Sequence, residues 1–173
     1  MPVTRLNHAV LYVRDAQRTA AFFEEALGFV RLVDSPRAVF MRAPGSTNDH
    51  DLGLFGIGDR AGPSGAGHAT VGLYHLAWEV DTLDELERLE GVLAGRGSLV
   101  GATDHGATKA LYAKDPDGIE FEVSWLVPAD LLHLIPAGHS GRERLDMGRE
   151  QQRFGGTTRG GIGVSTPAPT GSA

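Results

Sequence analysis

Histidine is the residue type best suited to chemistry in this chain, which has 7 histidines and no cysteine. Without thiols, a disulfide framework, a thiolate zinc site and a cysteine nucleophile are excluded, so any metal site must use His, Asp or Glu. His8 and His75 occupy the same place in two similar runs, LNHAVLYV and LYHLAWEV, and the same interval separates Val13 from Val80. A single strand histidine is usually a core or surface residue, but this matched pair indicates a shared role.

Two glutamates follow a predicted tight turn in the second half of the chain. The sequence DPDG at residues 115–118 is typical of such a turn, and strict alternation follows it. The alternation places Glu120 and Glu122 on one face of a strand, opposite Ile119, Phe121, Val123 and Trp125. Two histidines and one carboxylate form the open facial ligand set of non-haem iron sites. Glu122 is the candidate third ligand, and Glu120 is the alternative.

Each histidine run leads into a predicted amphipathic helix. Asp15 is the expected N-cap of the first helix and Gly28 follows its end. The buried positions of this helix are expected at Ala16, Ala20, Phe23 and Leu27. The second helix begins with a capping box from Thr82 to Glu85. Its buried positions are expected at Leu83, Leu86, Leu89 and Leu93.

Three short strands are predicted after each helix, so each half of the chain is a βαβββ unit in an α+β fold. The expected strands cover residues 30–33, 38–42 and 52–57, then 98–101, 108–113 and 119–125. The expected divisions are a first module at 1–60, a linker at 61–72, a second module at 73–127, a helical extension at 128–154 and a flexible tail at 155–173.

Composition excludes several classes of partner. The chain has 173 residues, 41% of them hydrophobic, with 16 Lys and Arg against 22 Asp and Glu and a net charge of −6. This acidic balance argues against nucleic acid and anionic membranes as partners. No apolar run approaches the roughly 18 residues that span a bilayer, and no signal peptide is evident at the start. We therefore expect a cytoplasmic protein.

The paired histidines, the LYAKDPDG sequence at residues 111–118 and Glu122 together resemble the vicinal oxygen chelate superfamily. That superfamily includes glyoxalases, fosfomycin and bleomycin resistance proteins, and type I extradiol dioxygenases. The resemblance covers residues 4–126. It implies two paired βαβββ modules whose curled mixed sheet surrounds a metal cavity, with His8, His75 and Glu122 as the metal ligands.

Three further features are similar to the extradiol dioxygenase branch. The sequence DHDLGLF at residues 49–55 resembles the strand that carries the acid–base histidine, which assigns that role to His50. Tyr112 precedes Glu122 at the spacing of the dioxygenase active-site tyrosine. His105 resembles a further histidine of that site, although its spacing to Tyr112 is shorter than in catechol 2,3-dioxygenases.

The resemblance leaves two alternatives to a dioxygenase. A glyoxalase I usually adds a fourth metal ligand from the last strand of its first unit. The matching place here is near Gly53, which has no side chain to bind a metal. Asp49 or Asp51 could supply this ligand if the strand register were shifted. A drug-binding resistance protein would not need the His/His/Glu set. The remaining histidines, His68, His133 and His139, have no such support and are interpreted as structural or exposed.

The expected function is therefore extradiol cleavage of a catechol-type aromatic diol with O₂. The cofactor would be Fe(II), with Mn(II) or another divalent ion as the alternative. His50 would act as the acid–base group, while Tyr112 and His105 would hydrogen-bond the diol oxygens. Aromatic pocket walls are expected from Phe40, Phe55, Trp78 and Trp125. A homodimer is the expected assembly.

Overall fold

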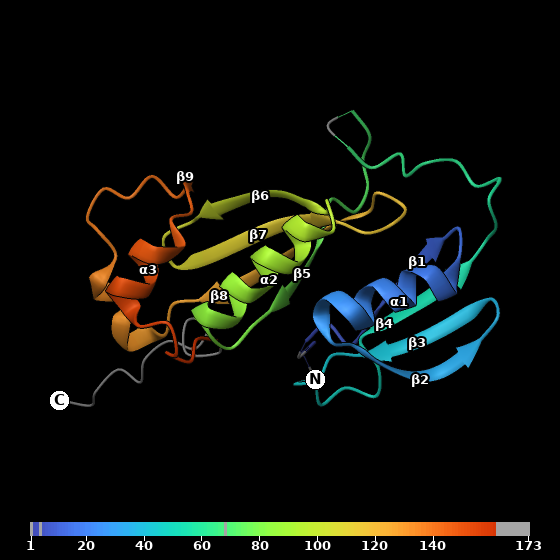
Figure 1. Cartoon of the computed structure of the whole chain (residues 1–173), viewed down its shortest axis with the longest axis horizontal. Coiled ribbons are helices and arrows are strands. Elements are labelled where there is room, and N and C mark those ends of the chain that lie inside the picture. Colours follow the sequence, from blue (N-terminus) through green and yellow to red (C-terminus); the bar gives the residue numbers. More distant parts are fainter. Residues whose placement is uncertain (1, 4, 68, 162–173) are drawn as a thin grey trace. The chain divides into compact units, whose positions relative to one another are not determined.

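The computed structural model describes residues 2–3, 5–67 and 69–161, in two compact units (Figure 1). The first unit contains the residues up to 70 together with the turn at 115–119, and the second contains 71–114 and the residues from 120 onward. Within the first unit, Arg14 and Arg18 both pair with Asp117 of that turn. Each unit has its own mixed sheet, which confirms the predicted α+β class.

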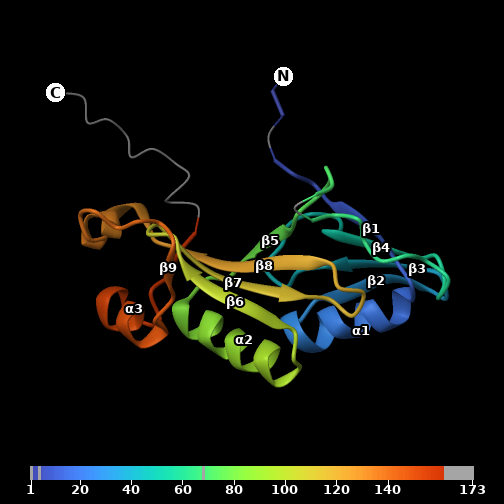
Figure 2. The same ribbon diagram turned by 90° about the horizontal axis from the view of Figure 1, so that it is seen from above.

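The first unit is built on a four-stranded sheet in the order β1-β4-β3-β2. Its elements are β1 (Ala9–Val13), α1 (Ala16–Leu27), β2 (Val30–Ser35), β3 (Ala38–Arg42) and β4 (Leu52–Gly56). Strand β1 is parallel to β4, and the other pairs are antiparallel. Helix α1 lies along one face of this sheet (Figure 2). The opposite face carries His8 and the exposed side chains of Val10 and Tyr12.

Helix α1 begins and ends where its caps predict. The Asp15 carboxylate accepts from the backbone N–H groups of Gln17 and Arg18, which satisfies donors that have no partner in the first turn. Gly28 ends the helix in the left-handed conformation, with φ of 73°, which costs a glycine little. The buried face includes Ala26 where the sequence pattern favoured Leu27, which is only half-buried.

The second unit has a five-stranded sheet in the order β5-β8-β7-β6-β9. Its strands and long helix are β5 (Leu76–Glu79), α2 (Leu83–Gly95), β6 (Leu99–Asp104), β7 (Thr108–Lys114) and β8 (Glu120–Leu126). Strand β5 is parallel to β8, as β1 is to β4. All four leucines predicted for the buried face of α2 are buried, and the hydroxyl of Thr82 accepts from the Glu85 N–H at 3.2 Å.

The chain after β8 packs against the second sheet as η1 (Ala129–Leu134), β9 (Glu143–Arg144) and α3 (Met147–Phe154). Trp125 is fully buried against Phe154, and its ring N–H donates to the Thr158 carbonyl at 3.1 Å. The expectation that Trp125 lines a pocket is therefore wrong, because its side chain is fully buried and packs against Phe154 of α3. A flexible tail was expected to begin at residue 155, but residues 155–161 form hydrogen bonds with the second unit. His68 and residues 162–173 lie outside the described residues.

Among the described residues, no helix has the length and apolar character needed to cross a membrane.

Candidate active site

The two matched histidines lie at equivalent places in the two units. His8 directly precedes β1, and His75 directly precedes β5. The strand pairing extends the equivalence, because Val10 pairs with Gly53 on β4 and Ala77 pairs with Glu122 on β8. Gly53 therefore occupies in the first unit the place that Glu122 occupies in the second.

In the second unit, His75 and Glu122 form a close pair. The distance from Nε2 of His75 to Oε2 of Glu122 is 3.1 Å. Nδ1 of His75 is buried and has no hydrogen-bond partner among the described residues. Adjacent ligands of an octahedral ion with bonds of about 2.1 Å lie about 3.0 Å apart, so this spacing fits two ligands of one divalent metal.

Tyr112 lies beside this pair. It faces Glu122 across the β7–β8 ladder, and its ring centroid is 5.6 Å from that of His75. Burial and then the negative charge of Glu122 raise the pKa of the Tyr112 phenol to about 12. Tyr112 therefore keeps its proton near neutral pH and is a hydrogen-bond donor.

His105 contacts Tyr112 through one ring nitrogen and the backbone through the other. Nε2 of His105 lies 2.9 Å from the Tyr112 hydroxyl, and Nδ1 lies 2.7 Å from the Gly141 carbonyl oxygen. Glu120, the alternative ligand, instead lies near the Tyr74 hydroxyl and raises the pKa of that phenol. The second unit thus groups His75, Glu122, Tyr112 and His105 on neighbouring segments.

The first unit groups His8 with His50, whose ring centroids are 4.4 Å apart. Nδ1 of His8 lies 2.7 Å from the side-chain oxygen of Asn7, which leaves Nε2 of a neutral ring with a lone pair for a metal. Nδ1 of His50 lies 3.0 Å from the Asp49 carboxylate. Nε2 of His50 is buried and has no hydrogen-bond partner within the described part of the chain. An imidazole held by a carboxylate with its other nitrogen open is suited to acid–base work.

The surroundings of Gly53 leave little room for a fourth ligand. A side chain built at Gly53 would meet Phe40 and Val10 at 3.3 Å, closer than ordinary packing. The buried Asp51 carboxylate accepts hydrogen bonds from the Ala43 N–H, the Ser46 hydroxyl and the Asn48 amide. These contacts, together with the exposed position of Asp49, argue against the fourth ligand expected of a glyoxalase I.

A second polar cluster in the second unit was not anticipated. Lys109, Asp104 and Glu150 have fully buried side chains, and the Lys109 ammonium lies 2.5 Å from Asp104 and 2.8 Å from Glu150. His139 lies 3.1 Å from Asp104. The local sequence around these residues gives no sign of the cluster, because the residue type does not show whether a charged side chain is buried or exposed.

Asp104, His139 and Glu143 could by proximity share a metal ion, since their ligand atoms lie within 4.8 Å of one another. Cations already occupy this cluster: the Arg149 guanidinium lies 3.6 Å from Asp104 and 3.8 Å from Glu143, and Lys109 binds Asp104. Nδ1 of His139 also accepts from the Gly141 N–H at 2.9 Å, so a neutral ring carries its proton on Nε2, the atom facing Asp104. The cluster is therefore better described as an ion-pair network.

A family model described as the Glyoxalase/Bleomycin resistance protein/Dioxygenase superfamily matches residues 5–123. The chain is 32% identical over 125 residues to biphenyl-2,3-diol 1,2-dioxygenase 3 of Rhodococcus globerulus, covering 68% of this chain and 62% of that protein. It is 28% identical over 124 residues to catechol-2,3-dioxygenase of Bacillus subtilis (strain 168), covering 69% and 41%. The matched region thus spans less than two thirds of either relative.

Solved structures share the fold at low identity. A glyoxylase/bleomycin resistance protein/dioxygenase domain from Frankia sp. EAN1pec has a TM-score of 0.59 at 22% identity, covering 81% of this chain and 98% of that one. A fosfomycin resistance protein from Listeria monocytogenes has a TM-score of 0.53 at 18% identity, covering 71% and 93%. At these identities the likeness establishes the fold but does not select a reaction.

Proposed function

Because the chain belongs to the Glyoxalase/Bleomycin resistance protein/Dioxygenase superfamily, we propose that it is an Fe(II)-dependent dioxygenase. Its substrates would be a catechol-type aromatic diol and O₂, and the ring would open at the C–C bond next to the diol. Both oxygen atoms of O₂ enter the ring-opened product, so the reaction needs no external reductant. The proposed ligands are His8, His75 and Glu122.

The observation that carries the proposal is the number of protein ligands. The strand register gives the second unit a glutamate where the first unit has Gly53, so the proposed set stops at three. Three protein ligands leave three octahedral positions, enough for two diol oxygens and O₂. When bound, the metal supplies Lewis acidity toward the diol oxygens and a path for electrons from the diol to O₂.

The side chains around the ligands have complementary roles in the proposal. His50 takes a proton from the diol at its open Nε2 and later returns it, while Asp49 holds the Nδ1–H. Tyr112 stays protonated, and in the proposal its single O–H, which His105 accepts in this structure, turns to the diol oxygen that gains negative charge once the diol is bound. Phe40 packs edge-on against His50, with centroids 5.0 Å apart, and gives this side an apolar wall suited to an aromatic ring.

The test uses the full chain purified without oxygen and loaded with Fe(II). We expect oxygen uptake and the yellow ring-opened semialdehyde with at least one member of a catechol panel that includes bulky and amino-acid-derived diols. The glutathione hemithioacetal should give no product. Absence of oxygen uptake with every diol would falsify the dioxygenase proposal, and turnover of the hemithioacetal with Ni(II) or Zn(II) would favour a glyoxalase-like enzyme.

A further inference from the structure

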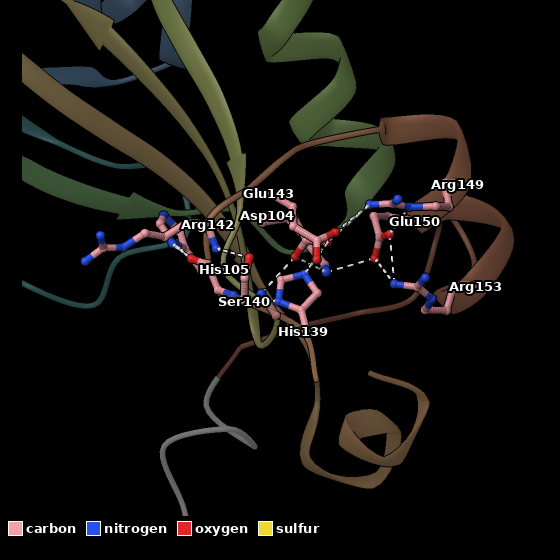
Figure 3. A network of polar contacts seen from close by, with 12 residues as sticks. Asp104, His105, His139, Ser140, Arg142, Glu143, Arg149, Glu150 and Arg153 are labelled. Atoms are coloured by element: carbon pink, nitrogen blue, oxygen red, sulfur yellow. Dashed lines mark hydrogen bonds and ion pairs between the residues drawn. The ribbon is translucent and has the colours of Figure 1, made fainter. Parts of the chain in front are cut away.

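The segment between η1 and α3 carries His139, which lies beside Asp104 in a network of polar contacts (Figure 3). The same segment contributes a backbone carbonyl to the group of residues around Tyr112. Gly141 lies in this segment, and its carbonyl oxygen is the partner of His105 Nδ1. Its N–H group binds Nδ1 of His139. His139 is 7% exposed and Asp104 is fully buried, so the contact between these two side chains is held away from water.

The hydrogen-bond partners fix where the protons lie in two neutral rings. The Gly141 N–H can only donate, so Nδ1 of His139 accepts and the ring proton lies on Nε2, which is 3.1 Å from Asp104. The Gly141 carbonyl can only accept, so Nδ1 of His105 carries a proton and donates. Nε2 of His105 is then the acceptor for the Tyr112 hydroxyl at 2.9 Å.

Asp104, the last residue in this series of contacts, also belongs to the ion-pair network. Asp104 accepts from the Lys109 ammonium at 2.5 Å and from the Gly106 N–H at 2.8 Å. Lys109 in turn binds Glu150 of α3 at 2.8 Å. The Asp104 carboxylate beside His139 therefore has a fixed place, because its charged partner Lys109 is fully buried.

We propose that His139 is a positioning residue for the reaction. It fixes the Gly141 peptide, whose carbonyl holds His105 in the Nδ1–H tautomer, and His105 then directs the Tyr112 hydroxyl. An imidazole whose tautomer is set by a neighbouring acceptor presents its other nitrogen in one defined state. The effect on turnover rests on the proposed function, but the effect on the tautomer does not.

Two substitutions at His139 separate positioning from simple packing. In His139→Asn, the amide oxygen takes the place of Nδ1 and can still accept from the Gly141 N–H. In His139→Gln, the amide takes the place of Nε2, so the contact with Asp104 can persist while the acceptor for Gly141 is lost. His133→Gln is the matched control, because His133 is an exposed histidine of η1 whose Nδ1 lies 2.8 Å from the Asp130 carbonyl oxygen, away from Gly141.

The direct readout is the tautomer of His105 from long-range ¹H–¹⁵N NMR on the full chain, loaded with Zn(II) in place of paramagnetic Fe(II). We expect the Nδ1–H form in the wild type, His139→Asn and His133→Gln, and a mixture in His139→Gln. A wild-type His105 in the Nε2–H form would overturn the proposal, as would the same spectrum in His139→Asn and His139→Gln. This measurement stands whether or not any diol is turned over.

The kinetic readout uses the iron-loaded enzyme and an accepted diol. We expect kcat of His139→Gln to fall about 10- to 100-fold, the usual effect of losing an orienting partner, with KM and iron content close to wild type. His139→Asn should recover most of that loss. An equal loss of kcat in both variants would assign His139 a packing role only. A wild type without activity would count against the proposed function, and the tautomer of His105 would then decide whether His139 is a positioning residue.

Discussion

His50 is held by a carboxylate on one side of its ring and left open on the other. This arrangement fits an acid–base residue better than a structural histidine, because burial of an unpartnered nitrogen costs free energy unless a ligand supplies the partner. His8 differs, because its ring is exposed and its Nδ1 is bound to a neutral amide. In the proposed function the two neighbouring imidazoles would therefore have different tasks, His50 binding a proton and His8 binding the metal.

His50→Phe should retain Fe(II) and still bind a catechol, but lose turnover by about 10²- to 10⁴-fold, the usual contribution of a positioned acid–base group. Iron content, catechol binding by absorbance and oxygen uptake check the three parts separately. Asp49→Asn is the milder companion, since it keeps the acceptor and removes the charge. Unimpaired turnover in His50→Phe would transfer the acid–base role to His105 or Tyr112.

Glu122→Ala and His75→Ala should abolish iron binding, whereas Glu120→Ala should spare it. The reason is that Glu122 lies 3.1 Å from His75, while Glu120 is engaged by the Tyr74 hydroxyl. Titration of Fe(II) into each variant under anaerobic conditions measures the difference. If Glu120→Ala and Glu122→Ala lose iron equally, the assigned ligand is wrong.

Helix α3 is joined to the second sheet by buried charges as well as by apolar packing. Lys109 on β7 reaches Glu150 on α3, and Trp125 on β8 packs against Phe154 on the same helix. Arg153 places one guanidinium nitrogen 2.9 Å from each oxygen of the Glu150 carboxylate. The segment that carries Gly141 is thus held between β8 at one end and α3 at the other.

Lys109→Met should lower the free energy of unfolding by about 3–5 kcal/mol, because it leaves buried carboxylates without their shared cation. Urea denaturation measures this loss. Arg88→Met is the matched control: Arg88 and Glu85 form an exposed pair on α2, with side chains 53% and 37% exposed, and its loss should cost less than about 1 kcal/mol. Equal losses in the two variants would show that water enters the cluster.

The same cluster predicts a pH dependence of stability. Burial by itself raises the pKa of Asp104, but the hydrogen bonds from Lys109 and the Gly106 N–H outweigh it and hold that pKa below its ordinary value. A lowered pKa in the folded state stabilises the protein above the unfolded-state pKa, and this stabilisation is lost as pH falls through the folded-state pKa. The difference in unfolding free energy between the wild type and Asp104→Asn should therefore shrink as the pH is lowered from neutral. A constant difference across an acid titration would contradict this.

The proposed ligands come from both units of the chain. His8 belongs to the first unit, and His75 and Glu122 belong to the second. The proposed site can therefore form within one chain or between the chains of a homodimer. We favour a homodimer because β2, an edge strand of the first sheet, leaves Val30, Leu32 and Val33 between 42% and 52% exposed.

Sedimentation equilibrium should give twice the 18.4 kDa mass of one chain. Mixing His8→Ala chains with Glu122→Ala chains then locates the site: shared sites would recover part of the activity in mixed dimers, whereas sites within one chain would stay inactive. A species of single-chain mass that retains iron and activity would rule out the homodimer.

The local structure and the equivalence of the two units could be predicted from residue types and their spacing. Asp15 and Thr82 start their helices as predicted, because a cap acts on backbone groups two or three residues away. The matched positions of His8 and His75 predicted two equivalent units. The strand register agrees, because Gly53 in the first unit is equivalent to Glu122 in the second. These features can be recognised in the sequence because a helix cap acts over a few residues and the histidine pattern occurs twice.

Which polar groups are buried, and which distant segments meet, depends on how the whole chain folds. Lys109 and Glu150 are separated by most of the extension, and nothing in their local sequence distinguishes a buried ion pair from two solvated charges. The Gly141 carbonyl that binds His105 is a backbone group and has no sequence signature. Trp125 was expected in a pocket wall and lies in the core, because the burial of a strand side chain depends on what packs against it, here Phe154 of α3.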